Sequence, residues 1–195
     1  MEIQLLNKDN FQIDSLDTFS RYQTVNNVYR LDGNNLKLRH CPFTEDWTAE
    51  RKREKAAEIL SGQYIVYGAV HEGRVVGTIM LIPELEHGRM IIDSYHVSTE
   101  FRRQGIGRRL FEAARTEASQ RGAVALYASA CSSEETINFY LAMGFRVSRD
   151  PIQALADDEP YDIQMECMIG DMKTARSNAG TFISRKRKRK SVMSC

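Results

Sequence analysis

The sequence predicts an α/β fold in which helices cover both faces of a mixed β-sheet. Two β-branched and aromatic runs that meet at Glu72-Gly73 predict a hairpin, and a strand followed by an amphipathic helix comes next, over residues 89–121. The strand–helix order repeats over residues 123–144, before two further strands. The chain has 195 residues, 42% of them hydrophobic, which suffices for one domain with a sizeable core. We therefore expect a single domain over residues 1–170.

The first third of the chain predicts two helices and a hairpin. Apolar side chains at helical spacing predict a helix over residues 11–24; they are Phe11, Leu16, Phe19 and Tyr22. Two short alternating runs flank the turn Asp32-Gly33-Asn34-Asn35, which predicts a hairpin. After "PFTEDW", the charged stretch "TAERKREKAAEILSG" predicts a helix that Gly62 closes.

The remaining elements follow in order from residue 64. The runs "YIVYGAVHEG" and "RVVGTIMLIP" predict the two strands of the hairpin, and "RMIIDSYHVS" predicts the next strand. Residues 106–121 form an amphipathic helix that Gly122 ends; its apolar face holds Ile106, Leu110, Phe111, Ala114 and Ala118. A buried strand, "AVALYASAC", leads to the short helix "SSEETINFYLAMG", with Ser132 or Ser133 as its N-cap. The last strands are "FRVSR" and "YDIQMECMI".

Composition excludes several classes of protein. No apolar run approaches the roughly 20 residues that a membrane-spanning helix needs. The N-terminal stretch "MEIQLLNKDNFQID" has no basic segment followed by an apolar one, as a secretory signal would. The cysteines, Cys41, Cys131, Cys167 and Cys195, lie far apart and form no C-x-x-C pair, which predicts packed thiols and no metal site. We expect a cytoplasmic protein with no membrane partner.

The stretch "EFRRQGIGRRLF", residues 100–111, joins a strand to a helix through Gly105 and Gly107. Glycines at such a junction permit a tight turn and leave backbone N–H groups bare at the start of the helix, where anions bind. The surrounding arginines can grip phosphate in a forked geometry; they are Arg102, Arg103, Arg108 and Arg109. The stretch therefore predicts a phosphate-bearing ligand, with an ordinary turn beside solvated arginines as the alternative. Because Leu110 holds the third glycine position, it is not a dinucleotide-binding fingerprint.

A second motif, "NFYLAMGF" at residues 138–145, changes the interpretation. With both motifs in this order, the chain resembles the GNAT superfamily of acetyl-CoA-dependent N-acetyltransferases, uncharacterised bacterial members included. That family carries R/Q-x-x-G-x-G/A, here Arg102 to Gly107, and F-Y-x-x-x-G-F, here Phe139 to Phe145. The resemblance covers about residues 64–169. It implies a central mixed sheet in which two parallel strands splay apart, here the strand ending at Ser98 and "AVALYASAC".

The resemblance implies acetyl-CoA as co-substrate and assigns its contacts. The pyrophosphate would lie on the backbone of residues 103–108, and the pantetheine arm would pair with the strand near its end. The implied cofactor-binding residues are Val97, Ser98, Arg102, Arg103, Gln104, Gly105, Ile106, Gly107, Arg108, Ser133 and Asn138. Family members often have asparagine where this chain has Ser133, which puts that contact in doubt. No metal is implied.

The same resemblance implies the catalytic roles. An amine must lose its proton before it attacks, because its reference pKa is about 10.4. Asp93 matches the family's acidic strand position and is the candidate base, with His96 and Glu84 as runners-up; a merely structural Asp93 is the alternative. The backbone N–H of Val97, at a bulge, would stabilise the oxyanion. Tyr140 would donate to the leaving sulfur, or else would only pack on the core.

The substrate side is expected in the variable residues 1–62 and the loop 83–89. An acidic rim could attract a cationic acceptor, though a solvated surface is the alternative; its members would be Glu45, Asp46, Glu84 and Glu86. Trp47 and Tyr29 either line an acceptor pocket or pack in the core. The acceptor is a small-molecule amine or a protein amine, and a homodimer is one assembly to test. The competing function is a non-catalytic acyl-CoA-binding sensor module of the same fold.

The end of the chain differs in charge from the rest. Residues 185–190, "RKRKRK", hold six of the 27 basic side chains, and the remaining 21 face 26 acidic ones. Residues 171–195 are therefore expected to form a flexible basic tail, with a nucleic-acid or nuclear-targeting patch as the alternative. We do not expect a nucleic acid as a partner.

Overall fold

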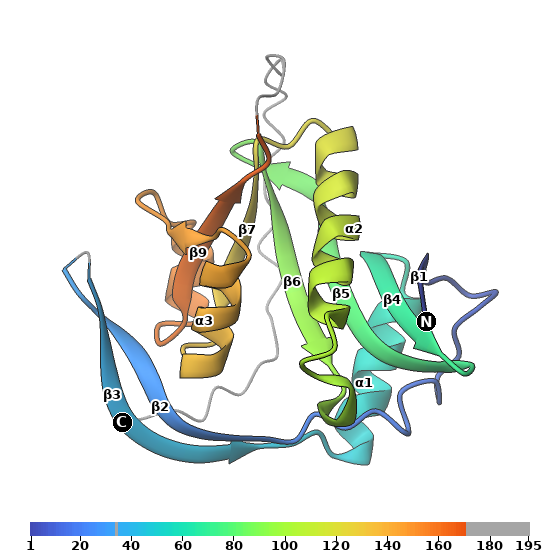
Figure 1. Cartoon of the computed structure of the whole chain (residues 1–195). Helices are drawn as coiled ribbons and strands as arrows, with labels where there is room; N and C mark the ends of the chain where they lie inside the picture. Colours follow the sequence, from blue (N-terminus) through green and yellow to red (C-terminus); the bar gives the residue numbers. More distant parts are fainter. Residues whose placement is uncertain (34, 171–195) are drawn as a thin grey trace.

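The computed structural model describes residues 1–33 and 35–170, and the basic tail lies outside them. A mixed sheet forms the centre of this described part (Figure 1), in the order β1-β4-β5-β6-β7-β9-β8. Its strands are β1 (Glu2–Leu5), β4 (Ile65–His71), β5 (Arg74–Glu86), β6 (Arg89–Val97), β7 (Ala125–Ala130), β9 (Ile163–Met168) and β8 (Arg146–Val147). Neighbouring strands are antiparallel except for β6 and β7, which are parallel.

A separate hairpin, four α-helices and a short 3₁₀ helix, η1 (Thr99–Phe101), complete the described fold. The hairpin consists of β2 (Gln23–Asp32) and β3 (Asn35–Glu45), and the helices are α1 (Ala49–Leu60), α2 (Ile106–Gln120), α3 (Glu134–Ala142) and α4 (Gln153–Asp158). Helices α2 and α3 pack on one face of the sheet, and α1 and α4 pack on the other. This arrangement confirms the predicted α/β class with helices on both faces of a mixed sheet.

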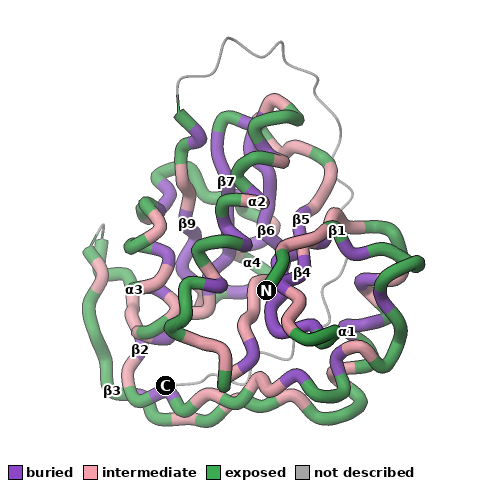
Figure 2. Tube along the Cα trace, turned by 45° about the vertical axis from the view of Figure 1, so that its right-hand side comes forward, coloured by how far each residue is buried: buried purple, intermediate pink, exposed green. Residues whose placement is uncertain are grey.

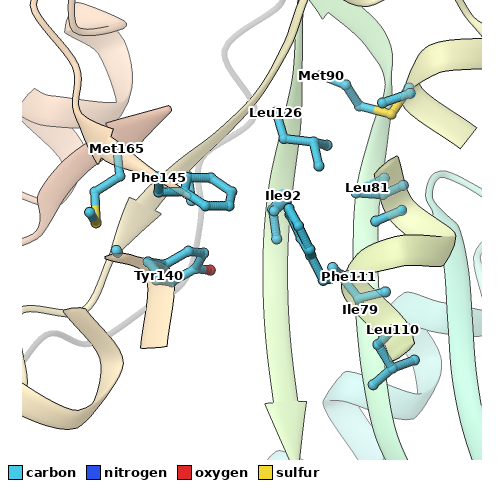
Figure 3. Packing of buried hydrophobic residues seen from close by; sticks show 14 of the residues in the cluster. Ile79, Leu81, Met90, Ile92, Leu110, Phe111, Leu126, Tyr140, Phe145 and Met165 are labelled. Atoms are coloured by element: carbon cyan, nitrogen blue, oxygen red, sulfur yellow. The ribbon is translucent and has the colours of Figure 1, made fainter. Parts of the chain in front are cut away.

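The core follows from the alternation of side chains along β5 and β6. Ile79 and Leu81 of β5 and Ile92 of β6 point to the face where α2 buries Leu110 and Phe111 (Figure 3). Ile91, which directly precedes Ile92, instead packs with α4 on the opposite face. Figure 2 shows that buried residues follow β5, β6 and β7 along much of their length, as expected for strands covered on both faces.

The parallel strands β6 and β7 pair over only part of their length. Their ladder begins at Arg89 and Ala125 and ends at Ile92 and Ala128, although β6 continues to Val97. Figure 1 shows the two strands diverging beyond this point. A β-bulge marks the same place, because Ile92 pairs with Leu81 and Ser94 pairs with Met80, leaving Asp93 as the extra residue. The expected splay of the central strands is therefore present.

The expected helix over residues 11–24 is wrong. Residues 12–18 form a series of turns closed by i→i+3 backbone bonds, and β2 already begins at Gln23. The three aromatic and leucine positions are still buried, against α1; they are Phe11, Leu16 and Phe19. The side chain of Ser15 accepts a hydrogen bond from the backbone N–H of Gln12, which stabilises a turn in competition with a helix.

The remaining expected elements are present, with two additions. The hairpin turn at residues 32–35 is confirmed, but β3 extends through Pro42 to Glu45, into the segment expected to lead into α1. Ser133 caps α3, since its hydroxyl accepts from the N–H of Thr136. Strand β1 and helix α4 were not expected. Within the described residues, no helix is long and apolar enough to cross a bilayer.

The packing of α2 yields a stability prediction. Leu110 is fully buried, so Leu110→Ala should lower the free energy of unfolding by about 2–5 kcal/mol through the cavity it leaves. Leu141→Ala is the matched control: it makes the same change on α3, where the side chain is 41% exposed, and should cost at most about 0.5 kcal/mol. Urea unfolding followed by circular dichroism measures both. Equal losses would contradict this account of the core.

Candidate active site

The glycine turn leaves backbone donors free at the start of α2. Gly105 precedes the helix in a left-handed conformation (φ +77°), which a side chain disfavours, and a Cβ there would meet nothing within 4 Å. The first helical bond runs from the N–H of Arg109 to the carbonyl oxygen of Gly105. The N–H groups of residues 106–108 therefore have no acceptor within the helix. Such a set of amides can hold an anion.

Gly107 permits a close approach between α2 and α3. A Cβ added at Gly107 would lie 3.0 Å from Cε2 of Phe139. The carbonyl of Gly107 accepts a hydrogen bond from the hydroxyl of Tyr95, whose ring also contacts those of Phe139 and Tyr140. Tyr95 thus links β6, α2 and α3, a role that sequence reasoning missed. No local pattern could have found it, because Tyr95 shares a face with Ile92 only through the bulge at Asp93.

The arginines around the turn divide into two groups. Arg103 and Arg108 are exposed beside the turn, whereas the guanidinium of Arg109 is directed away, to the carbonyl oxygen of Met1 at 3.3 Å. The side chain of Gln104 donates to the carbonyl of Glu100. Of the four arginines expected to surround an anion, two are bonded to backbone carbonyls elsewhere: Arg109 to Met1 and Arg102 to Val97.

Tyr140 lies on the same face of the sheet as the glycine turn. Its side chain is 6% exposed and packs against Phe145, with ring centroids 4.8 Å apart. Figure 3 shows its phenolic oxygen pointing from α3 toward β6. Burial and the neighbouring phenol of Tyr140 raise the pKa of Tyr95 well above 10, so the Tyr95 hydroxyl stays protonated and keeps its bond to Gly107.

The backbone of Val97 faces the gap between β6 and β7. The N–H of Ser98 bonds to the carbonyl of Val76, and antiparallel pairs alternate, so the N–H and C=O of Val97 point away from β5. Nε of Arg102 donates to that carbonyl at 3.0 Å. Burial, followed by repulsion from Arg21, lowers the pKa of Arg102. The bulge expected at Val97 lies instead at Asp93, because the antiparallel register next to Val97 is regular.

Ser98 is held by the segment that precedes β2. Its hydroxyl accepts from the backbone N–H of Ser20 at 2.9 Å and donates to Glu100 at 3.0 Å. Its side chain and its N–H are therefore engaged within the fold. Of the expected contacts at this end of β6, the structure exposes the backbone of Val97 and not that of Ser98 to the gap.

Asp93 lies on the opposite face, toward α1. It is 8% exposed, and its Oδ2 lies 4.0 Å from Nζ of Lys55, which is itself 3% exposed and also pairs with Glu58. The two runners-up lie in different places. His96 is near the gap at the end of β6, but Glu84 lies close to the β5–β6 turn, at the other end of these strands.

The open end of the splayed strands is covered by the segment 21–23 and the end of β3. Arg21 forms an ion pair with Glu45 at 2.9 Å and donates to His96 at 3.0 Å. Trp47 stacks on Phe19 and meets the ring of His96 edge-on, so it belongs to both the core and the edge of the site. Tyr29 donates to Asn138 of α3 at 3.2 Å.

The expected acidic rim forms only in part. Glu45 lies at the open end of the strands, but it is already paired with Arg21. Glu86 pairs in the sheet with Arg89, the first residue of β6, and so lies with Glu84 at the far end from Val97. The four acidic residues therefore do not come together. The reason is the length of β5 and β6, which the sequence-based rim did not take into account.

Cys131 follows β7 at the same open end. It is a free thiol, as expected, and so is Cys167, whereas the expectation is wrong for Cys41, which is disulfide-bonded. Burial, with the nearby carboxylates of Glu45 and Asp162, raises the pKa of the Cys131 thiol to about 12. A protonated thiol is a poor nucleophile, so nothing favours an acyl-cysteine intermediate here. Among the described residues, no group of His, Cys, Asp or Glu could hold a metal ion.

Comparison with known proteins agrees with this geometry. The model of the Acetyltransferase (GNAT) family matches residues 34–145, more than half of the chain, including the glycine turn and Tyr140. No curated protein matches the sequence significantly.

Solved acetyltransferases share the fold at low sequence identity. A nourseothricin acetyltransferase superposes with a TM-score of 0.66 at 18% identity, covering 86% of this chain and 98% of that one. The ribosomal-protein-S18-alanine N-acetyltransferase from Escherichia coli gives 0.55 at 16%, covering 92% and 99%. An aminoglycoside 6'-N-acetyltransferase complexed with coenzyme A gives 0.51 at 18%, covering 65% and 84%. At these identities the likeness shows the fold and leaves the substrate open.

The environment of Cys131 yields a pH-dependent prediction. With a pKa of about 12, roughly one thiol in 10,000 is ionised at pH 8, so iodoacetamide should modify Cys131 at least about 100-fold more slowly in the folded than in the urea-unfolded protein. The rate should rise about tenfold per pH unit between pH 8 and 10. Peptide mass spectrometry measures both rates. Equal modification of folded and unfolded protein would contradict the buried, protonated thiol.

Proposed function

Because the chain belongs to the acetyltransferase (GNAT) family, we propose that it moves the acetyl group of acetyl-CoA onto a primary amine by direct attack. One observation carries the proposal. The free amides of the glycine turn, the outward backbone of Val97 and the hydroxyl of Tyr140 all border the same gap between the splayed strands. A phosphate-bearing thioester that spans this gap would meet all three groups.

The chain offers a fitting site for acetyl-CoA. The amides of residues 106–108 have no acceptor within the helix, and the open space around Gly105 can admit a diphosphate. Arg103 and Arg108 lie exposed on either side of this turn. Val97 would pair with an amide of the pantetheine arm, which requires Arg102 to release the Val97 carbonyl. Ser133 and Asn138 border the gap from α3, and each already bonds to a side chain of β2.

The chemistry of the transfer can be assigned to three groups of the chain. Bound acetyl-CoA supplies an activated acetyl group as a thioester. Asp93 would take a proton from the amine, directly or through water, before the amine nitrogen attacks the carbonyl carbon. The N–H of Val97 would donate to the oxygen as it gains charge. As the C–N bond forms and the C–S bond breaks, the hydroxyl of Tyr140 would donate a hydrogen bond or a proton to the leaving sulfur.

The positions of Tyr140 and Asp93, both buried and on opposite faces of the sheet, support the roles proposed for them. Tyr140 reaches the gap from the face of α2 and α3, whereas Asp93 lies toward α1 beside Lys55. A cofactor on one side and an acceptor on the other would bring the amine to the thioester through the gap. The ammonium of Lys55 would fix the direction of the Asp93 carboxylate, 4.0 Å away.

The acceptor is proposed to be a primary amine on a small molecule or a protein. The similar folds carry names that specify acceptors of very different size: nourseothricin, aminoglycosides and an alanine of ribosomal protein S18. In this chain the acceptor would enter beside Trp47 and the Arg21–Glu45 pair.

A panel of amines tests the function. The protein is mixed with acetyl-CoA and, in turn, a streptothricin-type antibiotic, an aminoglycoside, a polyamine and a peptide beginning with alanine, and coenzyme A release is measured by chromatography. We expect turnover with at least one class. Tight binding of acetyl-CoA without turnover across the panel would point instead to a non-catalytic acyl-CoA-binding module.

Tyr140→Phe tests the role of the phenol. With the best acceptor of the panel, this variant should lower kcat by about 10- to 100-fold, with little change in acetyl-CoA affinity, because only the donor to sulfur is lost. Tyr67→Phe is the matched control, since Tyr67 also uses its hydroxyl, toward Glu117 of α2, but lies on β4 away from the gap. Steady-state kinetics compares the two. An unchanged kcat in Tyr140→Phe would leave the ring with a packing role alone.

Gly105→Asp tests the anion site. A carboxylate at the head of α2 would repel the diphosphate, so acetyl-CoA should bind at least about tenfold more weakly. Gly73→Asp introduces the same residue at nearly the same backbone angle (φ +74°), also with nothing within 4 Å, in the β4–β5 turn. The affinity of Gly73→Asp for acetyl-CoA should stay within about twofold of that of the natural protein. Titration calorimetry with acetyl-CoA measures both affinities. Equal affinities in the two variants would show that the diphosphate does not bind at Gly105.

A further inference from the structure

We infer that Arg21 is a positioning residue for the acceptor side of this site, an inference that rests on the proposed acetyl transfer. Arg21 lies two residues before β2, within the residues 1–62 expected on the substrate side, although no local pattern singled out this arginine. Its side chain is only 11% exposed. Every nitrogen of its guanidinium bonds to a different residue, and these partners come from separate parts of the fold.

The three bonds have good geometry. Nε donates to Nδ1 of His96 at 3.0 Å, Nη1 donates to Oε1 of Gln23 at 3.0 Å, and Nη2 donates to Glu45 at 2.9 Å. A guanidinium offers these donors in a fixed planar fork, which a lysine ammonium cannot reproduce. Gln23 and Glu45 are already paired across the β2–β3 hairpin, so Arg21 fixes the end of β6 relative to this end of the hairpin.

This network extends across the gap between the splayed strands. Nε2 of Gln23 donates to the hydroxyl of Ser133 at 3.3 Å, and Ser133 is the N-cap of α3. Helix α3 carries Tyr140, and His96 is the second-last residue of β6. The β6–β7 ladder has already ended at Ile92, so this series of side-chain bonds connects β6 to α3 where no backbone ladder does. Arg21 would thereby set the width of the opening through which the acceptor approaches.

Arg21 also determines the protonation of His96. An arginine N–H can only donate, so Nδ1 of His96 must be the unprotonated acceptor, and the proton of the neutral ring lies on Nε2. Trp47 holds the same ring edge-on, with the centroids 4.8 Å apart. His96 is then a fixed wall of the acceptor site and cannot take a proton through Nδ1, which leaves Asp93 as the better candidate base.

Kinetics of matched arginine variants tests the inference. Arg21→Met and Arg21→Lys should each lower kcat/KM for the acceptor by about 10- to 100-fold, because misplacement of reacting groups by about 1 Å has effects of this size. The KM for acetyl-CoA should change by less than about twofold. Arg30→Met is the control, since Arg30 also joins β2 to the segment before α3, by a 2.7 Å bond to Ser132, without touching β6. It should leave both parameters near those of the natural protein.

A spectroscopic readout keeps the inference separable from the proposed function. In ¹⁵N-histidine-labelled protein, long-range ¹H–¹⁵N spectra should show His96, assigned with His96→Asn, as the Nε2–H form, and Arg21→Met should mix the two tautomers. This result is measurable even if no amine is acetylated. Gln23→Leu serves if Arg21→Met fails to fold. It removes the link to Ser133 and the Nη1 contact of Arg21 but keeps the bonds of Arg21 to His96 and Glu45, so it should raise the acceptor KM with the tautomer unchanged. An unchanged tautomer in Arg21→Met, or equal kinetic losses in Arg30→Met, would overturn the inference.

Discussion

The early end of the β6–β7 ladder is the constraint on which the site depends. Backbone N–H and C=O groups inside a fold need partners, and beyond Ile92 no strand of the described residues pairs with β6 on its β7 side. The carbonyl of Val97 accepts from Arg102 as a result. The hairpin β2–β3 and the cap of α3 close the same opening with side-chain bonds. The gap is therefore a place where backbone groups of β6 are available to pair with an extended ligand.

The bulge at Asp93 determines which side chains of β6 lie on each face of the sheet. An extra residue changes which face the following side chains occupy. Ile92 and Tyr95 both face α2, so Tyr95 can bond Gly107 and contact Tyr140. Asp93 faces α1 and Lys55. In a regular strand Asp93 and Tyr95 would share a face, so the extra residue is what lets the carboxylate face Lys55 while the phenol reaches Gly107.

Local signals predicted most of the fold, and long-range pairing explains what they missed. Helices α2 and α3 carry their own apolar periodicity and caps, so the sequence was sufficient for both. Residues 11–18 bury Phe11 and Leu16 at helical spacing, yet hydrogen bonds from side chains to the backbone select turns. The bulge depends on the register of β5 against β6. Arg21 meets His96 across 75 residues of sequence, which no local pattern could reveal.

The hairpin β2–β3 has a consequence for how such a chain can diverge. It pairs only with itself, outside the main sheet, and side-chain bonds and one isolated β-bridge, between Val28 and Ser133, attach it to α3 and its cap. The glycine turn lies on a different segment, within the main body. Substitutions in the hairpin can thus accumulate without disturbing the proposed diphosphate site at the glycine turn. Related proteins could therefore keep the same acetyl donor and change the acceptor by substitutions in the β2–β3 hairpin alone.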